Sequence, residues 1–367
     1  MRRRPAPLVI PAVVAFAFAL AVGGCVRAPR CVPDERGAAA FTSPPAAAAG
    51  AGTPGNAPRP AISPAVARPG DPATRADDEI VVCGARFHTG TKVVLWTDPA
   101  GFDAYRPHRR FEPAEALPSD GREVPRYGSF RRGLDAALAA RVAADGWRLA
   151  DLQAVVHQVV LHYDAAGTSA QAFEVLHDRR GLSAHFLVDL DGTVYQTLDL
   201  KERAWHAGST NDRSVGIEVA NIGAYADRAV LDRWYAPSPE GARLVVPDGV
   251  RRGALPAGAT FVPARPGPIA GAIHGETVWQ HDFTAAQYEA LARLLAALSR
   301  VLPRCRLAAP RGADGEVLRT LLPDGEAGAA FEGVLGHWHV SGAKVDPGPA
   351  FQWDVVLERA RAVLDGR

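Results

Sequence analysis

The sequence predicts an α/β (or α+β) domain in which helices flank a mixed β-sheet. Two observations support this fold class. Helical and strand patterns interleave between about residues 133 and 364, and two Thr-x-x-Gln pairs have the spacing of capping boxes at helix starts. At 367 residues, the chain is long enough for one sizeable domain with insertions, or for two domains.

Local sequence patterns predict the first elements of the domain. Residues 133–145 have a helical pattern, and the Val-rich run from Ala154 to Tyr163 predicts a buried strand. Thr168 with Gln171 predicts a capping box that starts a helix, which Gly181 then ends.

A hairpin and a further strand follow this helix. Residues 184–198 alternate as two strands do, and Asp191-Gly192 is a pair that supplies the positive φ angles of a tight two-residue turn. The next strand is "RSVGIEVANIG", residues 213–223, whose apolar side chains share one face because successive side chains alternate. Glu218 interrupts this strand on the opposite face, where an ordinary glutamate faces solvent.

Two helices complete the domain. Thr284 and Gln287 form the second predicted capping box, which starts an amphipathic helix over about 285–302. A final helix covers about 351–364. The stretch 224–281 is rich in Pro and Gly, and we expect an insertion of long loops near one end of the sheet.

The N-terminus predicts export and lipidation. Arginines at positions 2–4 precede an apolar run over residues 8–22, which is typical of a signal peptide and too short to span a membrane. The run ends in "VGGC", which resembles a bacterial lipobox with Cys25 as the lipidated residue. We therefore expect a signal peptide over 1–24 and an outer-membrane lipoprotein facing the periplasm, although cleavage as an ordinary signal peptide is the alternative.

The next segment predicts a tether. Residues 25–78 are mostly Ala, Pro, Gly and Thr with few large apolar side chains, a composition that favours disorder. About 50 flexible residues have a root-mean-square reach on the order of 40 Å. We place the folded domain at 79–367, with an N-terminal extension over 79–150 and the insertion over 224–281.

Charge and cysteine content exclude some classes of protein. Lys and Arg total 41 against 40 Asp and Glu, so nothing suggests a nucleic-acid partner. Four cysteines without a CxxC pair are too few for a disulfide scaffold. If Cys25 carries lipid, one disulfide can form, and we predict Cys83 with Cys305 because Cys31 lies in the tether.

Residues suited to binding zinc lie at two distant places. His162 ends the predicted buried strand, where ligands commonly gather at the edge of a sheet. The loop-like segment 336–354 contains four further candidates: His337, His339, Lys344 and Asp346. Two imidazoles and one carboxylate suit a catalytic zinc, which takes three protein ligands.

Three sequence segments together resemble one family. "VVLHYDAAGTS", "LSAHFLVDLDGTVYQTLDLKERAWHAGSTNDRSVGIEVANIG" and "GHWHVSGAKVDPGPAFQWD" look like the successive motifs of zinc-dependent N-acetylmuramoyl-L-alanine amidases, the amidase-2 family, to which peptidoglycan recognition proteins are related. Lipidation further resembles the outer-membrane lipoprotein members of this family. The resemblance implies a central mixed sheet flanked by helices, with zinc in a groove that holds peptidoglycan or muropeptides.

The resemblance also assigns roles to residues. It implies that His162, His337 and Asp346 bind Zn²⁺, that Glu218 is the catalytic general base, and that Lys344 assists. The implied reaction is hydrolysis, by a zinc-activated water, of the amide between the lactyl group of N-acetylmuramic acid and L-alanine, in cell wall remodelling or recycling. Glu218 would then interrupt its strand because it faces the groove.

The choice between two histidines stays open at this stage. Eight residues separate His337 from Asp346, where the family pattern leads us to expect nine. In an extended segment His337 and His339 project to the same side, so both could approach the metal. The family places its ligand directly after Gly, which favours His337 and leaves His339 to orient a ligand or contact substrate.

Other residues and other functions also fit parts of the sequence. His206 and Trp205 match motif positions and can line the groove, whereas His185 is better explained as a packed strand residue. A peptidoglycan-binding receptor without activity would lack one zinc ligand, and none is lacking here. A zinc D,D-carboxypeptidase would need Gly at Val188 and Asp at Gly192. An amidase acting on an unrelated amide remains an alternative.

Overall fold

The computed structural model describes residues 69–70, 76–111, 126–323 and 326–366. The chain divides into two units, Met1–Ile62 and Ser63–Arg367, and every described residue belongs to the second. The predicted signal peptide, Cys25 and nearly all of the predicted tether lie outside the described residues. Among the helices of the described ranges, none combines the length and the apolar character needed to cross a membrane.

A mixed sheet of six strands forms the centre of this unit, in the order β14-β5-β9-β6-β7-β3. Its strands are β14 (Gly333–Gly336), β5 (Gln158–Tyr163), β9 (Ser214–Val219), β6 (Phe186–Val188), β7 (Val194–Gln196) and β3 (Val93–Leu95). The first four are parallel, β7 is antiparallel to β6, and β3 is parallel to β7. The predicted fold class is therefore confirmed.

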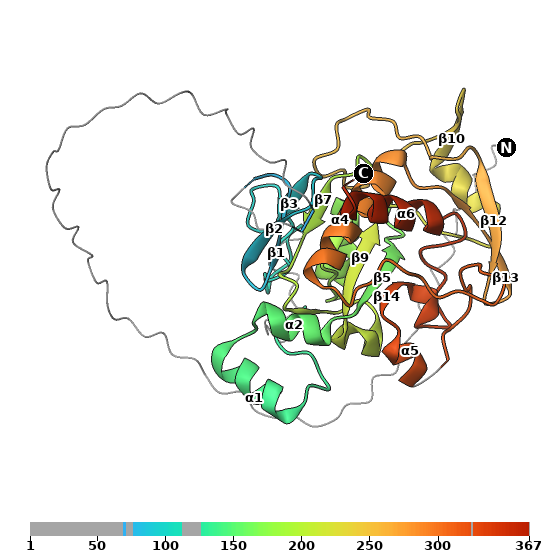
Figure 1. Ribbon diagram of the computed structural model, residues 1–367. Coiled ribbons are helices and arrows are strands. Elements are labelled where there is room, and N and C mark those ends of the chain that lie inside the picture. The colour runs from blue at the N-terminus through green and yellow to red at the C-terminus, as the bar shows by residue number, and fades with distance from the viewer. Residues whose placement is uncertain (1–68, 71–75, 112–125, 324–325, 367) are drawn as a thin grey trace, which may run out of the picture. The chain divides into compact units, whose positions relative to one another are not determined.

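Helices α4 (Ala285–Val301) and α6 (Trp353–Leu364) cover one face of the sheet (Figure 1). Alternate residues of the strands point toward them, so the main core combines strand and helix side chains: Val159, Leu161, Val215, Ile217, Leu291, Leu294, Leu295, Leu298, Val356 and Leu357. Burying each of these large side chains contributes roughly 1.5–3 kcal/mol. This face is fully occupied by the core, which leaves the opposite face for the polar residues of β5 and β9.

The opposite face is partly covered by helix α3 (Ser169–Phe173), which continues as the π-helical turn η2 (Glu174–Arg179). Phe173 packs there with Leu187 of β6 and Tyr195 of β7 in a second, smaller core. The predicted helix start is confirmed, because Thr168 caps the amide of Gln171. The predicted reciprocal half of the capping box is wrong, since the Gln171 side chain bonds Arg251 and Glu174 instead.

The N-terminal extension adds elements that the sequence patterns did not indicate. They are β1 (Glu79–Val82), β2 (Ala85–His88), β4 (Tyr127–Gly128) and α2 (Leu149–Val155), while α5 (Glu326–Ala330) and β8 (Arg203–Ala204) lie later in the chain. The extension also contains α1 (Ala136–Asp145). The predicted helix over 133–145 is confirmed as α1. The strand predicted from Ala154 begins only at Gln158, because residues before Val156 complete α2.

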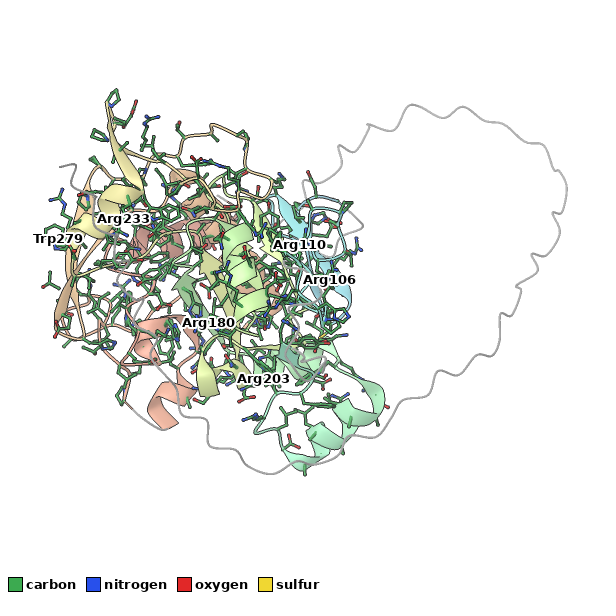
Figure 2. The ribbon with its side chains drawn as sticks, turned by 180° about the vertical axis from the view of Figure 1, so that it is seen from behind. Arg106, Arg110, Arg180, Arg203, Arg233 and Trp279 are labelled. Atoms are coloured by element: carbon green, nitrogen blue, oxygen red, sulfur yellow. The ribbon has the colours of Figure 1, made fainter. Side chains whose placement is uncertain are left out.

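The insertion over 224–281 contains regular structure as well as the expected loops, of which the longest, 245–267, has neither helix nor strand beyond isolated bridges. It holds a 3₁₀ segment η4 (Arg228–Arg233) and two antiparallel hairpins, β10 (Tyr235–Ser238) with β11 (Gly241–Leu244) and β12 (Pro268–Ile273) with β13 (Glu276–His281). Figure 2 shows the chain from behind, with Trp279 of β13 at the margin and Arg180 nearer the centre.

The turn of the β6–β7 hairpin also differs from its prediction. Val188 pairs with Val194, which leaves a five-residue connection between them. Gly192 has φ +83°, but Asp191 does not have a positive φ. The Asp191 carboxylate instead accepts from the amide and hydroxyl of Thr193, and this local bonding stabilises the longer turn.

The predicted disulfide is wrong. Cys83 and Cys305 are both free thiols in the structure. Cys83 lies in the β1–β2 turn, where its amide donates to Asp199, whereas Cys305 is buried after α4 with its thiol against the carbonyl of Val156. Burial raises the pKa of both thiols to about 12, so neither is a reactive thiolate.

Candidate metal centre and active site

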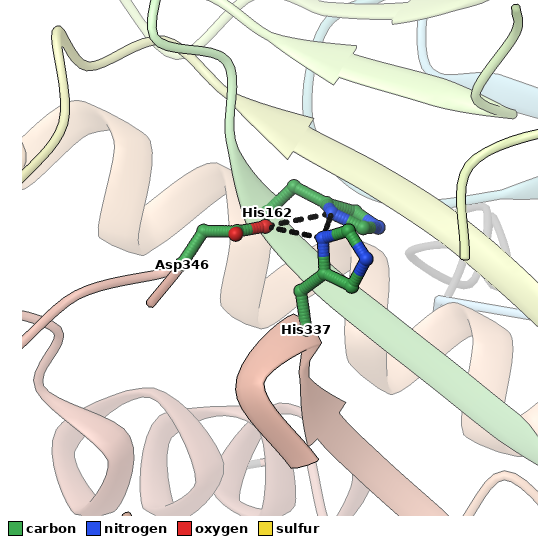
Figure 3. Close-up of side chains that lie close together, drawn as sticks. All are labelled: His162, His337 and Asp346. Atoms are coloured by element: carbon green, nitrogen blue, oxygen red, sulfur yellow. Dashed lines mark hydrogen bonds and ion pairs between the residues drawn. The ribbon is translucent and has the colours of Figure 1, made fainter. Parts of the chain in front are cut away.

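Three side chains from distant parts of the sequence converge at the carboxyl ends of β5 and β14 (Figure 3). Nδ1 of His162 lies 3.0 Å from Nδ1 of His337 and 2.8 Å from Oδ2 of Asp346, and the latter two atoms are 2.9 Å apart. All three residues are buried. His162 is the penultimate residue of β5, His337 follows β14 directly, and Asp346 lies in the loop beyond.

The protonation states of this cluster suit a metal. Burial, and secondly the charge of His337, lower the pKa of His162 to about 4, so its imidazole is neutral at pH 7. Burial alone would raise the pKa of Asp346, but His337 and His162 together hold it below its usual range, so the carboxylate is ionised. Neutral imidazole and carboxylate are the forms that bind metals.

The other nitrogen of His162 is held by His206. Nε2 of His162 lies 3.0 Å from Nδ1 of His206, and Nε2 of His206 lies 3.3 Å from Oγ of Ser214. If Nδ1 of His162 binds a metal, its Nε2 carries the proton and donates to His206, which donates in turn to Ser214. The His206 ring packs directly on β9, because a Cβ on Gly216 would lie 2.6 Å from it.

Glu218 lies beside the cluster on the same face of the sheet. It pairs with His162 in the β5–β9 ladder, and paired residues of neighbouring strands point the same way. Its side chain is buried, and its carboxylate has no hydrogen-bond partner in the part of the chain that the structure describes. Burial, followed by the charges of Asp346 and Asp164, raises the pKa of Glu218 well above its ordinary value.

Positive charges approach the same place. The ammonium of Lys344 acts on both Glu218 and His162 and favours a lower pKa for each. Arg180, which follows η2 and is exposed, acts on Glu218 in the same direction. Figure 2 places Arg180 toward the centre of the face opposite α4 and α6.

His339 does not join the cluster. His337 and His339 lie in a single 3₁₀ turn, η5 (His337–His339), so the expectation of an extended segment is wrong and the two rings diverge. Nδ1 of His339 accepts from the amide of Gly336, and Nε2 donates to the carbonyl of Leu318. Both nitrogens are used by the backbone, which leaves His337 as the histidine that meets His162 and Asp346.

The histidine at position 185 and two tryptophans of the motif segments, Trp205 and Trp338, make no side-chain hydrogen bond to the cluster among the described residues. Both nitrogens of His185 bond backbone groups, those of Gly216 and Glu202, and the prediction of a packed residue is confirmed. Trp338 is buried in the core with its indole N–H on Leu318. Trp205 is half-buried, and no side-chain bond connects it with the cluster among the described residues.

Two amide side chains close to the site were missed from the sequence. Asn221 follows β9 and bonds the backbone of His281, and Gln280 of β13 bonds the backbone of Pro347, which follows Asp346 directly. Asn221 lies within a quoted motif, but nothing there indicates its bonds. Gln280 lies in the insertion, and no local pattern indicates contact with a loop about 65 residues later.

The donor set fits zinc. Two imidazole nitrogens and one carboxylate oxygen are a ligand combination that catalytic zinc takes, and the second nitrogen of His162 is already held by His206. The set lacks the rings of oxygen ligands that Ca²⁺ and Mg²⁺ prefer. We therefore take zinc as the metal that these residues would hold.

Comparison with known proteins identifies the family. The family model "N-acetylmuramoyl-L-alanine amidase" (Amidase_2) matches residues 152–349, more than half of the chain. These bounds contain all three cluster residues and Glu218. A search of curated proteins finds no match.

Four chains of solved structure match. One is a selenomethionine derivative of AmpD, with 19% identity and a TM-score of 0.27, covering 58% of this chain and 86% of that one. Another is the E. coli N-acetylmuramyl-L-alanine amidase AmiD in complex with the substrate anhydro-N-acetylmuramic acid-L-Ala-D-γ-Glu-L-Lys, with 21% identity and a TM-score of 0.29, covering 56% of this chain and 57% of that one. The assignment rests on the family model alone: the chain belongs to the Amidase_2 family of N-acetylmuramoyl-L-alanine amidases.

Proposed function

We propose that the protein is a zinc-dependent hydrolase that cleaves the amide between the lactyl group of N-acetylmuramic acid and L-alanine in peptidoglycan or muropeptides. Family membership supports the bond and the substrate class. The observation that carries the mechanism is a His-His-Asp donor set beside Glu218, a buried carboxylate without a hydrogen-bond partner among the described residues.

Each residue has a role in this reaction. His162, His337 and Asp346 hold zinc, which when bound polarises the scissile carbonyl and makes water a stronger nucleophile. Glu218 takes a proton from the attacking water and returns it to the leaving amine, and its raised pKa brings it closer to the neutral range in which a general base works best. The Lys344 ammonium stabilises the oxyanion of the tetrahedral intermediate.

Digestion of purified sacculi and of defined muropeptides tests this function. We expect the full-length protein to release free stem peptides beginning with L-alanine and to leave lactyl carboxylates on the glycan, both identified by mass spectrometry. A chelator should stop the reaction and zinc should restore it. Products cut elsewhere in the peptide, or no products from zinc-loaded protein, would contradict the proposal.

Two other functions have less support. In a D,D-carboxypeptidase the histidine at position 185 would bind zinc, but both of its nitrogens bond backbone groups here. A receptor without activity would not need Glu218 beside a complete donor set. The same digestion separates these functions, because a carboxypeptidase releases D-alanine and a receptor releases nothing.

We further propose that the protein is an outer-membrane lipoprotein that faces the periplasm. The lipobox sequence around Cys25 supports this location. Cys25→Ser should move the protein from outer-membrane to soluble fractions, because one acyl-modified cysteine is the membrane anchor that the sequence offers. A Cys25→Ser protein that stays in the outer-membrane fraction would count against lipidation.

A further inference from the structure

The loop that carries Lys344 and Asp346 has little regular structure to hold it. Residues 341–349, which we call the ligand loop, contain neither helix nor strand. Asp346 nevertheless has to stay within hydrogen-bond distance of His162 in β5 and of His337 directly after β14. The amide of Trp338 donates to the carbonyl of Asp346 at 3.3 Å, and further contacts from outside the loop are needed to hold the rest of it.

Hairpin β12–β13 of the insertion contacts the ligand loop at three places. Nε2 of His274 donates to the carbonyl of Lys344 at 3.0 Å, and Nε2 of Gln280 donates to the carbonyl of Pro347 at 2.9 Å. At the third place the Pro349 side chain packs against the backbone of β12, because a Cβ on Gly271 would lie 2.7 Å from the Cβ of Pro349. In the described part of the chain, His274 and Gln280 supply all the side-chain hydrogen bonds to the backbone of the ligand loop.

Gln280 also connects the loop with the rest of the site. Its Oε1 accepts from the backbone amide of Ala350, directly after the ligand loop, at 3.0 Å. Its Nε2, which donates to Pro347, also donates to Oδ1 of Asn221 at 3.3 Å. The backbone amide of Asn221 donates to the carboxylate of Asp164, which lies two residues after His162. This network joins the chain just after β5, just after β9 and just after Asp346.

The hydrogen bonds of Gln280 are buried, so their loss should be costly. Gln280 is 0% exposed, and Gly348 packs so closely that a Cβ there would lie 2.1 Å from Oε1 of Gln280. Removing the amide would leave buried groups of Pro347, Ala350 and Asn221 without this partner, and a buried polar group that loses its partner destabilises the arrangement around it. The loop would then relax toward other positions of Asp346.

We propose that hairpin β12–β13 is a positioning element for the metal centre, and that Gln280 is the positioning residue that holds Asp346 in register with His162. This inference rests on the proposed zinc site but not on the proposed substrate. It assigns to the insertion a role at the site, through backbone groups of the ligand loop. Residues that orient metal ligands typically change metal affinity by about 10–100-fold when they are replaced.

Zinc affinity of the full-length protein, measured by competition with a chromophoric chelator, tests the proposal. Gln280→Met keeps the side-chain volume and removes all three amide bonds. We expect a loss of zinc affinity of about tenfold or more. His274→Asn, at a half-buried position, should lower zinc affinity by a smaller factor, because His274 bonds the loop two residues before Asp346.

Gln196 of β7 offers a matched control. It is also 0% exposed, and its amide makes three hydrogen bonds of 2.8 Å, to both backbone groups of Val81 and to the carbonyl of Leu198. Gln196→Met should lower the melting temperature about as much as Gln280→Met while leaving zinc affinity within about twofold of wild type. The pair separates positioning of the loop from a general loss of stability.

Three outcomes would overturn the proposal: unchanged zinc affinity in Gln280→Met, an equal loss of affinity in Gln196→Met, or a wild-type protein without affinity for zinc. If Gln280→Met fails to fold, the same comparison is made between His274→Asn and wild type, and unchanged affinity there would overturn it. A wild-type protein that binds zinc but cleaves no muropeptide would contradict the proposed function without contradicting the positioning role of Gln280.

Discussion

The two halves of the metal centre are held in different ways. His162 and Glu218 lie side by side on β5 and β9. The ladder holds the two strands in register, and their apolar face, opposite to these two residues, packs against α4 and α6. Asp346 and Lys344 lie on a loop without helix or strand, which the buried Gln280 and the half-buried His274 of the insertion hold from outside. The sheet half is rigid because of its own strands, whereas the loop half depends on bonds to a distant segment.

This difference separates two kinds of defect. A substitution in the sheet half that keeps the fold should change chemistry or one ligand without moving the others. A substitution around the loop should instead weaken metal binding through displaced ligands. Substitutions in each half of the centre test this division.

Removing a ligand should have the largest effect. His337→Ala deletes one of three donors, and we expect tightly bound zinc to be lost and amidase activity to fall to the uncatalysed background. Metal content of the purified protein and product release from muropeptides measure both. Stoichiometric zinc in a His337→Ala protein would show that the cluster uses another ligand set.

Glu218→Gln should abolish most of the catalytic activity and leave zinc bound. We expect activity to fall on the order of 10²–10⁴-fold with zinc content unchanged, because general-base catalysis contributes about this factor. Burial raises the pKa of Glu218, so ionisation destabilises the zinc-free fold as pH rises above the ordinary glutamate range. The zinc-free variant should therefore be at least as stable as wild type at pH 8, and a large loss of stability would contradict this account.

The sequence predicted the sheet half better than the loop half for a physical reason. Strand periodicity and cap signals are local, so β5, β9 and α4 were all found; the bounds of α4 were nearly right, whereas the predicted β5 began four residues too early and the predicted β9 ended four residues too late. The bonds of Gln280 and His274 are set by tertiary packing of a hairpin whose Pro- and Gly-rich sequence suggested loops. The three cluster residues were named from motifs, but the turn that separates His337 from His339 appears only in the structure.

His206→Phe should weaken zinc binding without removing a ligand. The ring volume is largely kept while the bond to Nε2 of His162 is lost, and we expect about a 10–100-fold lower zinc affinity. His185→Phe is the matched control, because the His185 ring is buried nearby but bonds only backbone groups. Equal zinc affinities in the two variants would contradict a role of His206 in orienting His162.

His339→Ala should have the smallest effect on the metal. His339 bonds the amide of Gly336 and the carbonyl of Leu318, so its loss leaves the buried amide of Gly336 without this partner, at roughly 1–3 kcal/mol, while the Leu318 carbonyl keeps its bond from the indole of Trp338. His337 should nevertheless stay in place, because Gly336 pairs with Leu161 in the sheet and the carbonyl of His337 still accepts from two following amides. We therefore expect a lower melting temperature, full zinc content, and a loss of zinc affinity of less than about tenfold, smaller than in Gln280→Met. The opposite pattern, with zinc lost from His339→Ala and kept in His337→Ala, would transfer the ligand role to His339 and place the metal on the loop side of η5.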